Sequence, residues 1–232
     1  LIGTADGPMT AQFEEANGDI EAGPRSIRDV VLRFGNAEIV LPDGAAVKAG
    51  SLVVHLQESA RVDDSITAAN AEKGTGVAFD ARDLVLPKEW DPALGPTIDR
   101  ISVDAVITGN VVPRGRLAQV MTDWRDAGGA LEVKALAADW QKLSLKADGT
   151  FALDEDLQPQ GAMTAIIDGV EPTADSLIAA GGIDPQAAFA AKVANRALTM
   201  GGGPAKIPLT IQQQRLYLGP VPLLKLKPVK WD

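Results

Sequence analysis

The chain has 232 residues, of which 46% are apolar and 23% charged, so it carries enough apolar surface to fold as a globular protein. Its net charge of −9 argues against nucleic-acid binding, which depends on Lys and Arg neutralising phosphates. The absence of cysteine excludes disulfides and thiolate chemistry, and the single histidine, His55, excludes most other metal and triad chemistry.

The N-terminal half of the chain predicts β-strands, because apolar and polar residues alternate in it. Residues 27–41 alternate on both sides of Gly35-Asn36, a pair typical of a two-residue hairpin turn. Pro42-Asp43-Gly44 predicts the next turn, and residues 52–56 predict a third strand with His55 on its more polar face.

Further strands are predicted over residues 77–86 and 101–107. Residues 63–76 are polar and predict a loop, within which Gly74-Thr75-Gly76 is interpreted as a turn. The alternation changes phase before Leu84, which predicts a β-bulge. Residues 87–96 predict a turn region around Trp90.

The first helix is predicted over residues 116–127, where Leu117, Val120, Met121 and Trp124 have helical spacing. Alternation then resumes in four segments that predict strands, with a turn at Asp148-Gly149 between the second and the third. These segments are residues 131–137, 143–147, 151–153 and 162–167.

Two more helices are predicted, over residues 173–180 with Thr173 as N-cap and over residues 184–200 with Asp184-Pro185 at its start. The inward stripe of the longer helix is predicted to hold Phe189, Val193 and Arg196-Ala197. Strands over residues 207–218 follow, and the remaining residues to Trp231 are predicted to be extended but irregular.

About nine or ten strands joined by short links predict an α+β fold, because short links make neighbouring strands antiparallel. We expect a large curved sheet, an open half-barrel or groove, with about three helices packed on or inside it. Residues 1–24 are interpreted as an N-terminal extension and residues 25–232 as a single domain, with a weak sub-boundary near residue 113.

The sequence offers no catalytic or phosphate-binding motif, so we expect no enzyme activity, cofactor or metal. His55 is predicted to be a solvent-side or partly buried strand residue, since a triad would require Ser51 and Asp63 to converge on it. Asp154-Glu155-Asp156 lacks the spacing of a calcium loop and predicts a solvated hairpin turn.

The C-terminal tract places Lys225, Lys227 and Lys230 among leucines and Trp231. It fits either peripheral contact with an anionic membrane surface or an edge strand protected by lysine and proline.

Residues 131–169 follow a strand–Trp–strand–Gly–strand pattern with a Pro-x-Gly ending, and residues 215–220 read RLYLGP. Both segments resemble an uncharacterised alphaproteobacterial envelope family, a domain of unknown function, and the resemblance covers about residues 25–228. The pattern is more loosely similar to AsmA-like envelope proteins, whose long sheets form lipid-holding grooves. The resemblance implies an exported, periplasmic protein anchored by an N-terminal apolar segment, which these residues do not show, and it transfers no catalytic residue.

A curled sheet with one apolar face and few large side chains leaves concave space, which the helices either fill or leave open as a groove for an acyl chain. We therefore expect a non-enzymatic envelope protein that binds or transfers a lipid or other apolar ligand. The alternative is a structural or interaction module that docks an envelope partner through a sheet edge. The expected groove lining consists of Leu32, Phe34, Phe79, Val103, Ala105, Leu145, Phe151, Ala165 and Ile167.

Overall fold

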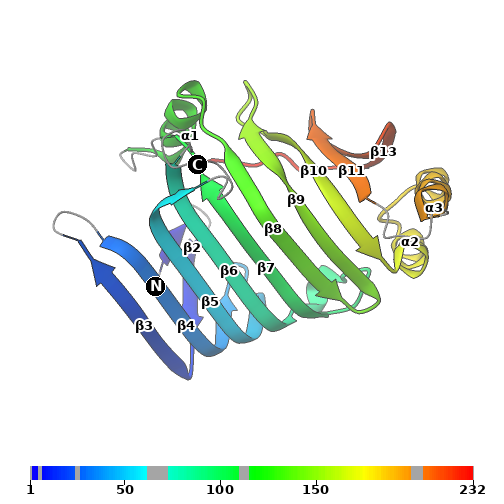
Figure 1. The fold of residues 1–232 in the computed structure, drawn as a ribbon. Coiled ribbons are helices and arrows are strands. Elements are labelled where there is room, and N and C mark those ends of the chain that lie inside the picture. The colour runs from blue at the N-terminus through cyan, green and yellow to red at the C-terminus, as the bar shows by residue number, and fades with distance from the viewer. Residues whose placement is uncertain are drawn as a thin grey trace.

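The protein is described by a computed structural model that covers residues 2–4, 7–23, 27–61, 73–109, 115–199 and 206–231. Within these ranges one antiparallel sheet of 13 strands dominates (Figure 1). Each strand pairs with its neighbour in the chain, except that β2 and β3 both pair with β4. The strands are β1 (Ile2–Thr4), β2 (Gly7–Gln12), β3 (Glu15–Ala22), β4 (Ile27–Val40), β5 (Ala46–Arg61), β6 (Lys73–Val85), β7 (Thr97–Ile107), β8 (Leu131–Trp140), β9 (Leu143–Leu153), β10 (Pro159–Asp168), β11 (Lys206–Gln212), β12 (Arg215–Leu218) and β13 (Val221–Lys225).

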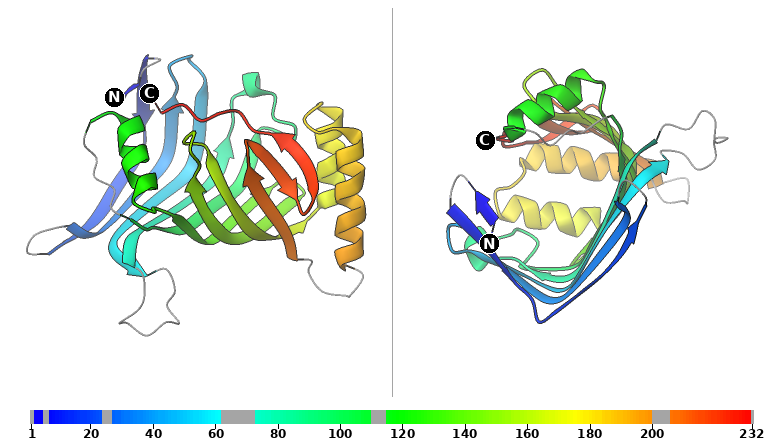
Figure 2. Two further views of the ribbon diagram at one scale, coloured as in Figure 1. Left: turned by 90° about the horizontal axis from the view of Figure 1, so that it is seen from above. Right: turned by 90° about the vertical axis from the view of Figure 1, so that its left-hand side faces the viewer.

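One helix lies over the strand ends where β7 passes to β8, two helices lie near the C-terminal edge of the curled sheet, and the sheet stays open along one side (Figure 2). The helices are α1 (Leu117–Asp126), α2 (Val170–Ala179) and α3 (Pro185–Thr199), with a short 3-10 turn η1 (Lys88–Trp90) after β6. The predicted α+β fold with a large, open, antiparallel sheet is therefore confirmed. Residues 2–22, expected as an extension, contribute three strands, and residue 113 lies outside the described ranges.

The hairpin predicted at Gly35-Asn36 is wrong, because β4 runs through this pair without ending. Asn36 adopts a left-handed conformation with φ 48°, yet Gly35 pairs with Ser51 and Ala37 pairs with Ala49. The register with β5 is the same on both sides. A single left-handed residue thus turns the strand without terminating it, since β5 continues alongside.

The phase change predicted in β6 occurs at Asp83, in the cross-strand row that contains Asn36 of β4 and Gly50 of β5. Asp83 is also left-handed, with φ 52°, and the glycine between it and Asn36 is Gly50 of β5. The phase change is confirmed but the bulge is wrong, because Arg82 pairs with Arg100 and Leu84 with Ile98, so no residue is inserted. The sheet folds along this row, and β2 and β3 lie against β4 on opposite sides of the fold (Figure 2).

Two other predicted turns, Gly74-Thr75-Gly76 and Asp148-Gly149, lie inside β6 and β9. Gly149 is needed for close approach rather than for a turn, because a Cβ there would clash with the carbonyl oxygen of Ala162 on β10. A real irregularity falls in β8, whose register shifts between Val133 and Leu136. The rest of the predicted loop, residues 63–72, lies outside the described ranges.

The helices follow the sequence with two corrections. α2 begins at Val170, and Gly169 rather than Thr173 is its N-cap. α3 begins as predicted, with the Asp184 carboxylate accepting the N–H of Gln186 at 2.8 Å. Its predicted inward stripe is wrong, and the exposed residues Phe189, Val193, Arg196 and Ala197 point outward.

Alanines of α3 face the sheet in place of that stripe. Ala188 and Ala191 are buried, whereas Phe189 is 69% exposed, because small side chains let the helix approach the sheet closely. The buried cluster that Ala191 joins lies at the C-terminal end of the sheet. It contains Ala147, Ala165, Ala191, Ile207, Leu209 and Leu218.

We predict that Gly169→Ala will be much more damaging than Gly181→Ala, although both glycines have a positive φ, 77° and 69°. A Cβ at position 169 would also clash with the Lys142 carbonyl oxygen, whereas no described atom lies within 4 Å of a Cβ at position 181. We expect free-energy losses of about 3 kcal/mol or more for Gly169→Ala and about 1 kcal/mol for Gly181→Ala in urea unfolding. Equal losses would show that the crowding at Gly169 is not real.

Candidate functional site

The inner face of the sheet is a trough whose floor carries only apolar side chains and glycine. Strand pairing aligns this floor in three rows across the sheet. The first row is Ile20, Val30, Leu56, Val77, Ala105, Val133, Gly149, Met163, Leu209 and Leu218. The second is Gly18, Leu32, Val54, Phe79, Val103, Leu136, Ala147, Ala165 and Ile207. The third is Ala16, Phe34, Leu52, Ala81, Ile101, Ala138, Leu145 and Ile167.

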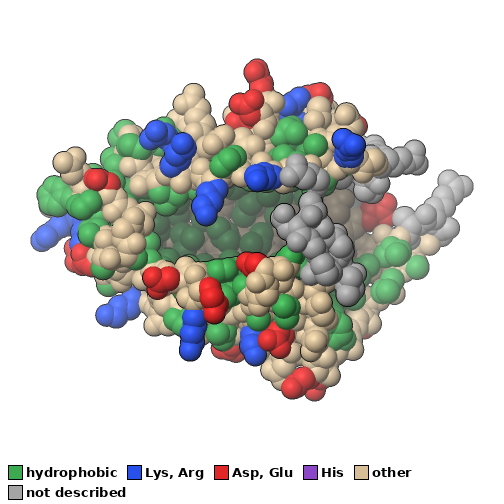
Figure 3. Space-filling model, turned by 180° about the vertical axis from the view of Figure 1, so that it is seen from behind, with side chains coloured by type: hydrophobic (Ala, Val, Ile, Leu, Met, Phe, Trp, Pro, Cys, Tyr) green, Lys and Arg blue, Asp and Glu red, His purple; other side chains and the backbone are tan. Residues whose placement is uncertain are grey.

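The trough is covered at one end and uncovered over the rest of its length. Ala165 and Ile207 are fully buried beneath α3, but Leu32, Phe79 and Val103 remain only half-buried in the middle of the sheet. Nearer the edge, Leu56 is 40% and Ile20 65% exposed. The space-filling view shows the resulting hollow, with hydrophobic side chains inside and charged ones around it (Figure 3).

The total surface supports this description. The chain exposes 14420 Å², whereas a compact monomer of 24.2 kDa exposes about 10,000 Å². An area above that of a compact monomer agrees with an open sheet that is not packed against a complete second layer.

All nine residues predicted to line a groove lie on this inner face. Eight belong to the three rows, and Phe151 lies in a fourth row with Leu131. Ala105 and Ala165 are 2% and 0% exposed, so they form the floor beneath other side chains and cannot touch a ligand. The other seven are half-buried and accessible from the trough; they are Leu32, Phe34, Phe79, Val103, Leu145, Phe151 and Ile167.

The trough continues into a cavity of about 310 Å³ below α1, which we term the α1 pocket. The sequence analysis did not predict this pocket, because its walls come from six separate segments of the chain. The helical spacing of Met121 and Trp124 was the only signal. The pocket is lined by Ile107, Met121, Trp124, Leu131, Phe151, Ala152, Leu153, Pro159 and Trp231.

One wall of the α1 pocket is the C-terminal strap, residues 226–231, which follows β13. The side chain of Gln158, only 6% exposed, holds it at Val229: Oε1 accepts the backbone N–H at 2.8 Å and Nε2 donates to the carbonyl at 3.2 Å. Lys225 is the last residue of β13, which lies at the edge of the sheet, as the edge-strand prediction for this tract expects. Lys227 and Lys230 are exposed on the strap.

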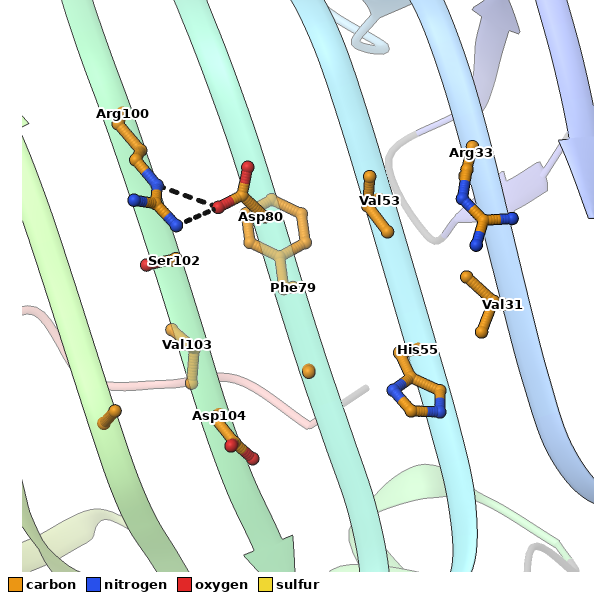
Figure 4. Close-up of a pocket in the computed structure, with 12 residues that line it drawn as sticks. Val31, Arg33, Val53, His55, Phe79, Asp80, Arg100, Ser102, Val103 and Asp104 are labelled. Carbon is orange, nitrogen blue, oxygen red and sulfur yellow. Dashed lines mark hydrogen bonds and ion pairs between the residues drawn. The ribbon is translucent and has the colours of Figure 1, made fainter.

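The outer face holds a second depression, of about 460 Å³, with a different character (Figure 4). Most of its charged groups are paired: Arg100 with Asp80 at 2.6 Å, His55 with Asp29 at 2.7 Å, and Arg33 with Asp19 at 2.6 Å. His55 is thus the partly buried strand residue that the sequence predicted. Ion pairs already satisfied in this way stabilise a solvated sheet face and leave little charge for a ligand.

The other candidate chemistry has a structural explanation. Asp154 begins the β9–β10 turn, and its carboxylate accepts the N–H groups of Asp156 and Gln158, so the predicted hairpin turn is confirmed. Among the described residues no group of three His, Asp or Glu side chains could hold a metal. Asp63, the third member of the hypothetical triad, lies outside the described ranges. No helix within them is long and apolar enough to cross a bilayer.

Comparison with known proteins gives a family but no function. The profile of a family described as "Uncharacterized protein conserved in bacteria (DUF2125)" matches residues 5–227. No curated protein and no solved structure matches the chain.

We predict that Asp80→Asn lowers stability at neutral pH. Burial acts to raise the pKa of Asp80, but hydrogen bonds from Arg100 and Arg82, and their charges, outweigh it and lower the pKa. A lowered pKa stabilises the fold above the unfolded value of about 3.9, and this stability is lost as the pH falls through the folded value. We expect a loss of about 0.5–1 kcal/mol at pH 7 that disappears in acid, measured by urea unfolding.

The control is Asp104→Asn in the same outer depression, for which the described residues include no ion pair. It should change the unfolding free energy by less than about 0.5 kcal/mol. An Asp80→Asn loss that persists unchanged below pH 3 would contradict the electrostatic explanation.

Proposed function

The chain belongs to the family DUF2125, and we propose that it is a non-enzymatic envelope protein that holds or transfers a lipid in the trough. The observation that carries the proposal is the half-exposed apolar floor between β3 and β8. Covering it with hydrocarbon is favourable by about 2.5 kcal/mol for each 100 Å² of apolar surface removed from water. A protein that only needed a core would not leave this face uncovered.

The dimensions of the trough favour an acyl chain over a small apolar molecule. Five strand spacings of about 4.8 Å separate β3 from β8, so the uncovered floor extends about 24 Å along the sheet. One leaflet of a bilayer has a hydrocarbon depth of about 15 Å. The trough can therefore accept most or all of a membrane lipid's chain lying flat.

The chemistry of the floor supports binding rather than catalysis. General acid–base or nucleophilic catalysis needs a titratable or nucleophilic side chain beside the substrate. The three rows contain none, and the ionisable groups of the adjoining strand segments face outward, where several of them form ion pairs. The absence of cysteine and the resemblance to AsmA-like envelope proteins support a periplasmic location.

One observation favours the alternative, an interaction module. All eight residues of β3 are exposed, and within the described ranges this strand pairs on one side only, with β4. A partner strand could extend the sheet there. Glu15, Asp19 and Glu21 oppose indiscriminate pairing, because charged side chains protect a sheet edge.

The test compares Val54→Asp with Val53→Asp. The two valines are adjacent in β5 and both half-buried, but Val54 lies on the floor of the trough and Val53 on the outer face. We expect Val54→Asp to weaken binding of the fluorescent fatty acid cis-parinaric acid, displaced by palmitate, at least tenfold. Val53→Asp should bind like the wild type, and circular dichroism should show that both variants are folded.

Equal affinities for the two variants would show that the fatty acid does not bind in the trough. A wild-type protein that takes up neither palmitate nor phosphatidylglycerol, but retains a stable protein partner unless β3 carries a proline, would favour the interaction module.

A further inference from the structure

We propose that the α1 pocket receives the methyl end of an unbranched acyl chain whose remainder lies in the trough. This inference rests on the proposed function, and it adds which part of the ligand binds where. The pocket is preformed, and its wall includes Trp231, which belongs to the C-terminal strap rather than to the sheet or α1.

The pocket continues the floor of the trough directly. Ile107, Leu131 and Phe151 form a fourth cross-strand row. This row lies two residues along each strand from Ala105, Val133 and Gly149 of the first row, so it faces the same side. A chain lying on the trough can therefore enter the pocket without crossing a polar barrier.

The lining of the pocket selects hydrocarbon against a peptide or a lipid head group. Its only polar side-chain groups are two indole N–H groups, and both are already used. Trp124 donates to the Thr108 carbonyl at 2.7 Å, and Trp231 donates to the Leu157 carbonyl at 2.7 Å. A peptide or head group placed here would lose its hydrogen bonds to water and gain none, at a cost of several kcal/mol.

The size of the pocket fits the end of a chain. An apolar cavity of about 150 Å³ accommodates benzene, and this pocket, at about 310 Å³, is twice that volume. It is too small for a whole lipid, which needs the trough as well. Its volume therefore limits how much of a chain it can hold.

The strap is held firmly enough to act as a wall. Gln158 binds both the N–H and the carbonyl of Val229, and the Trp231 indole is fixed to Leu157 two residues later. All three contacts join the C-terminus to the β9–β10 turn, more than 70 residues earlier. A preformed wall lowers the ordering cost of binding.

The first experiment measures affinity against chain length. Each buried methylene contributes about 0.8 kcal/mol, or about fourfold in affinity. We expect the wild type to bind saturated fatty acids about fourfold more tightly per added carbon until the pocket is full, and then to level off. Met121→Trp, which fills the pocket, should move this plateau to shorter chains and weaken palmitate binding at least tenfold.

The matched control is Leu117→Trp. Leu117 lies one helical turn before Met121 on α1 and is 47% exposed, outside the pocket lining. It should leave the chain-length plateau unchanged. Loss of long-chain affinity in both variants alike would overturn the assignment of the pocket.

The second experiment does not depend on filling the pocket. In the variant Trp90→Phe/Trp140→Phe the pocket indoles Trp124 and Trp231 are the remaining tryptophans. Palmitate brominated at its methyl end should quench their fluorescence by at least half, whereas palmitate brominated beside the carboxylate should quench much less. Bound palmitate that quenches equally from both positions, or more from the carboxylate end, would overturn this inference while the proposed function stood. No palmitate binding at all would overturn both.

Discussion

The whole structure depends on one constraint: one face of the sheet is apolar along three cross-strand rows, and the helices of the chain are too few to cover it. An antiparallel sheet normally packs that face against a second layer. Within the described residues the helices cover only the C-terminal part of this face and the strand ends near β7 and β8, and the middle of the floor is left half-buried. Large exposed apolar patches are typical of binding surfaces, and the proposed ligand is argued from this packing.

The opposite face of the middle strands is polar. Between β4 and β7 the outward rows carry ion pairs that cross from strand to strand, such as Arg100 with Asp80 and His55 with Asp29. Each pair adds little stability, but together the pairs keep the outer face polar and the trough the only apolar face of the middle sheet. The fold along Asn36 and Asp83 then bends this two-faced sheet into a trough.

The errors of the sequence-based prediction share one physical cause. Asn36 and Asp83 carry turn-forming residue types, yet each lies within a strand because neighbouring strands pair on both sides and hold the register. Gly149 was interpreted as a turn, although its role is to let the β10 backbone approach. In α3, helical spacing could not reveal which stripe faces the sheet, since the small residues Ala188 and Ala191 serve close packing better than Phe189 does. In each case a long-range contact outweighed a local preference.

The sequence by itself determined most of the strands after residue 27, their antiparallel pairing and the inner face to which all nine predicted lining residues belong, because alternation with a period of two assigns each side chain to a face. It did not predict the three strands within residues 2–22. Only the tertiary structure decided which of the nine lining residues are accessible and which, such as Ala105 and Ala165, are covered. It alone also brought Trp231 beside Trp124 and Phe151 to form the α1 pocket. Contacts between segments so far apart in the chain depend on the path of the backbone in space, and no local pattern of residues encodes that path.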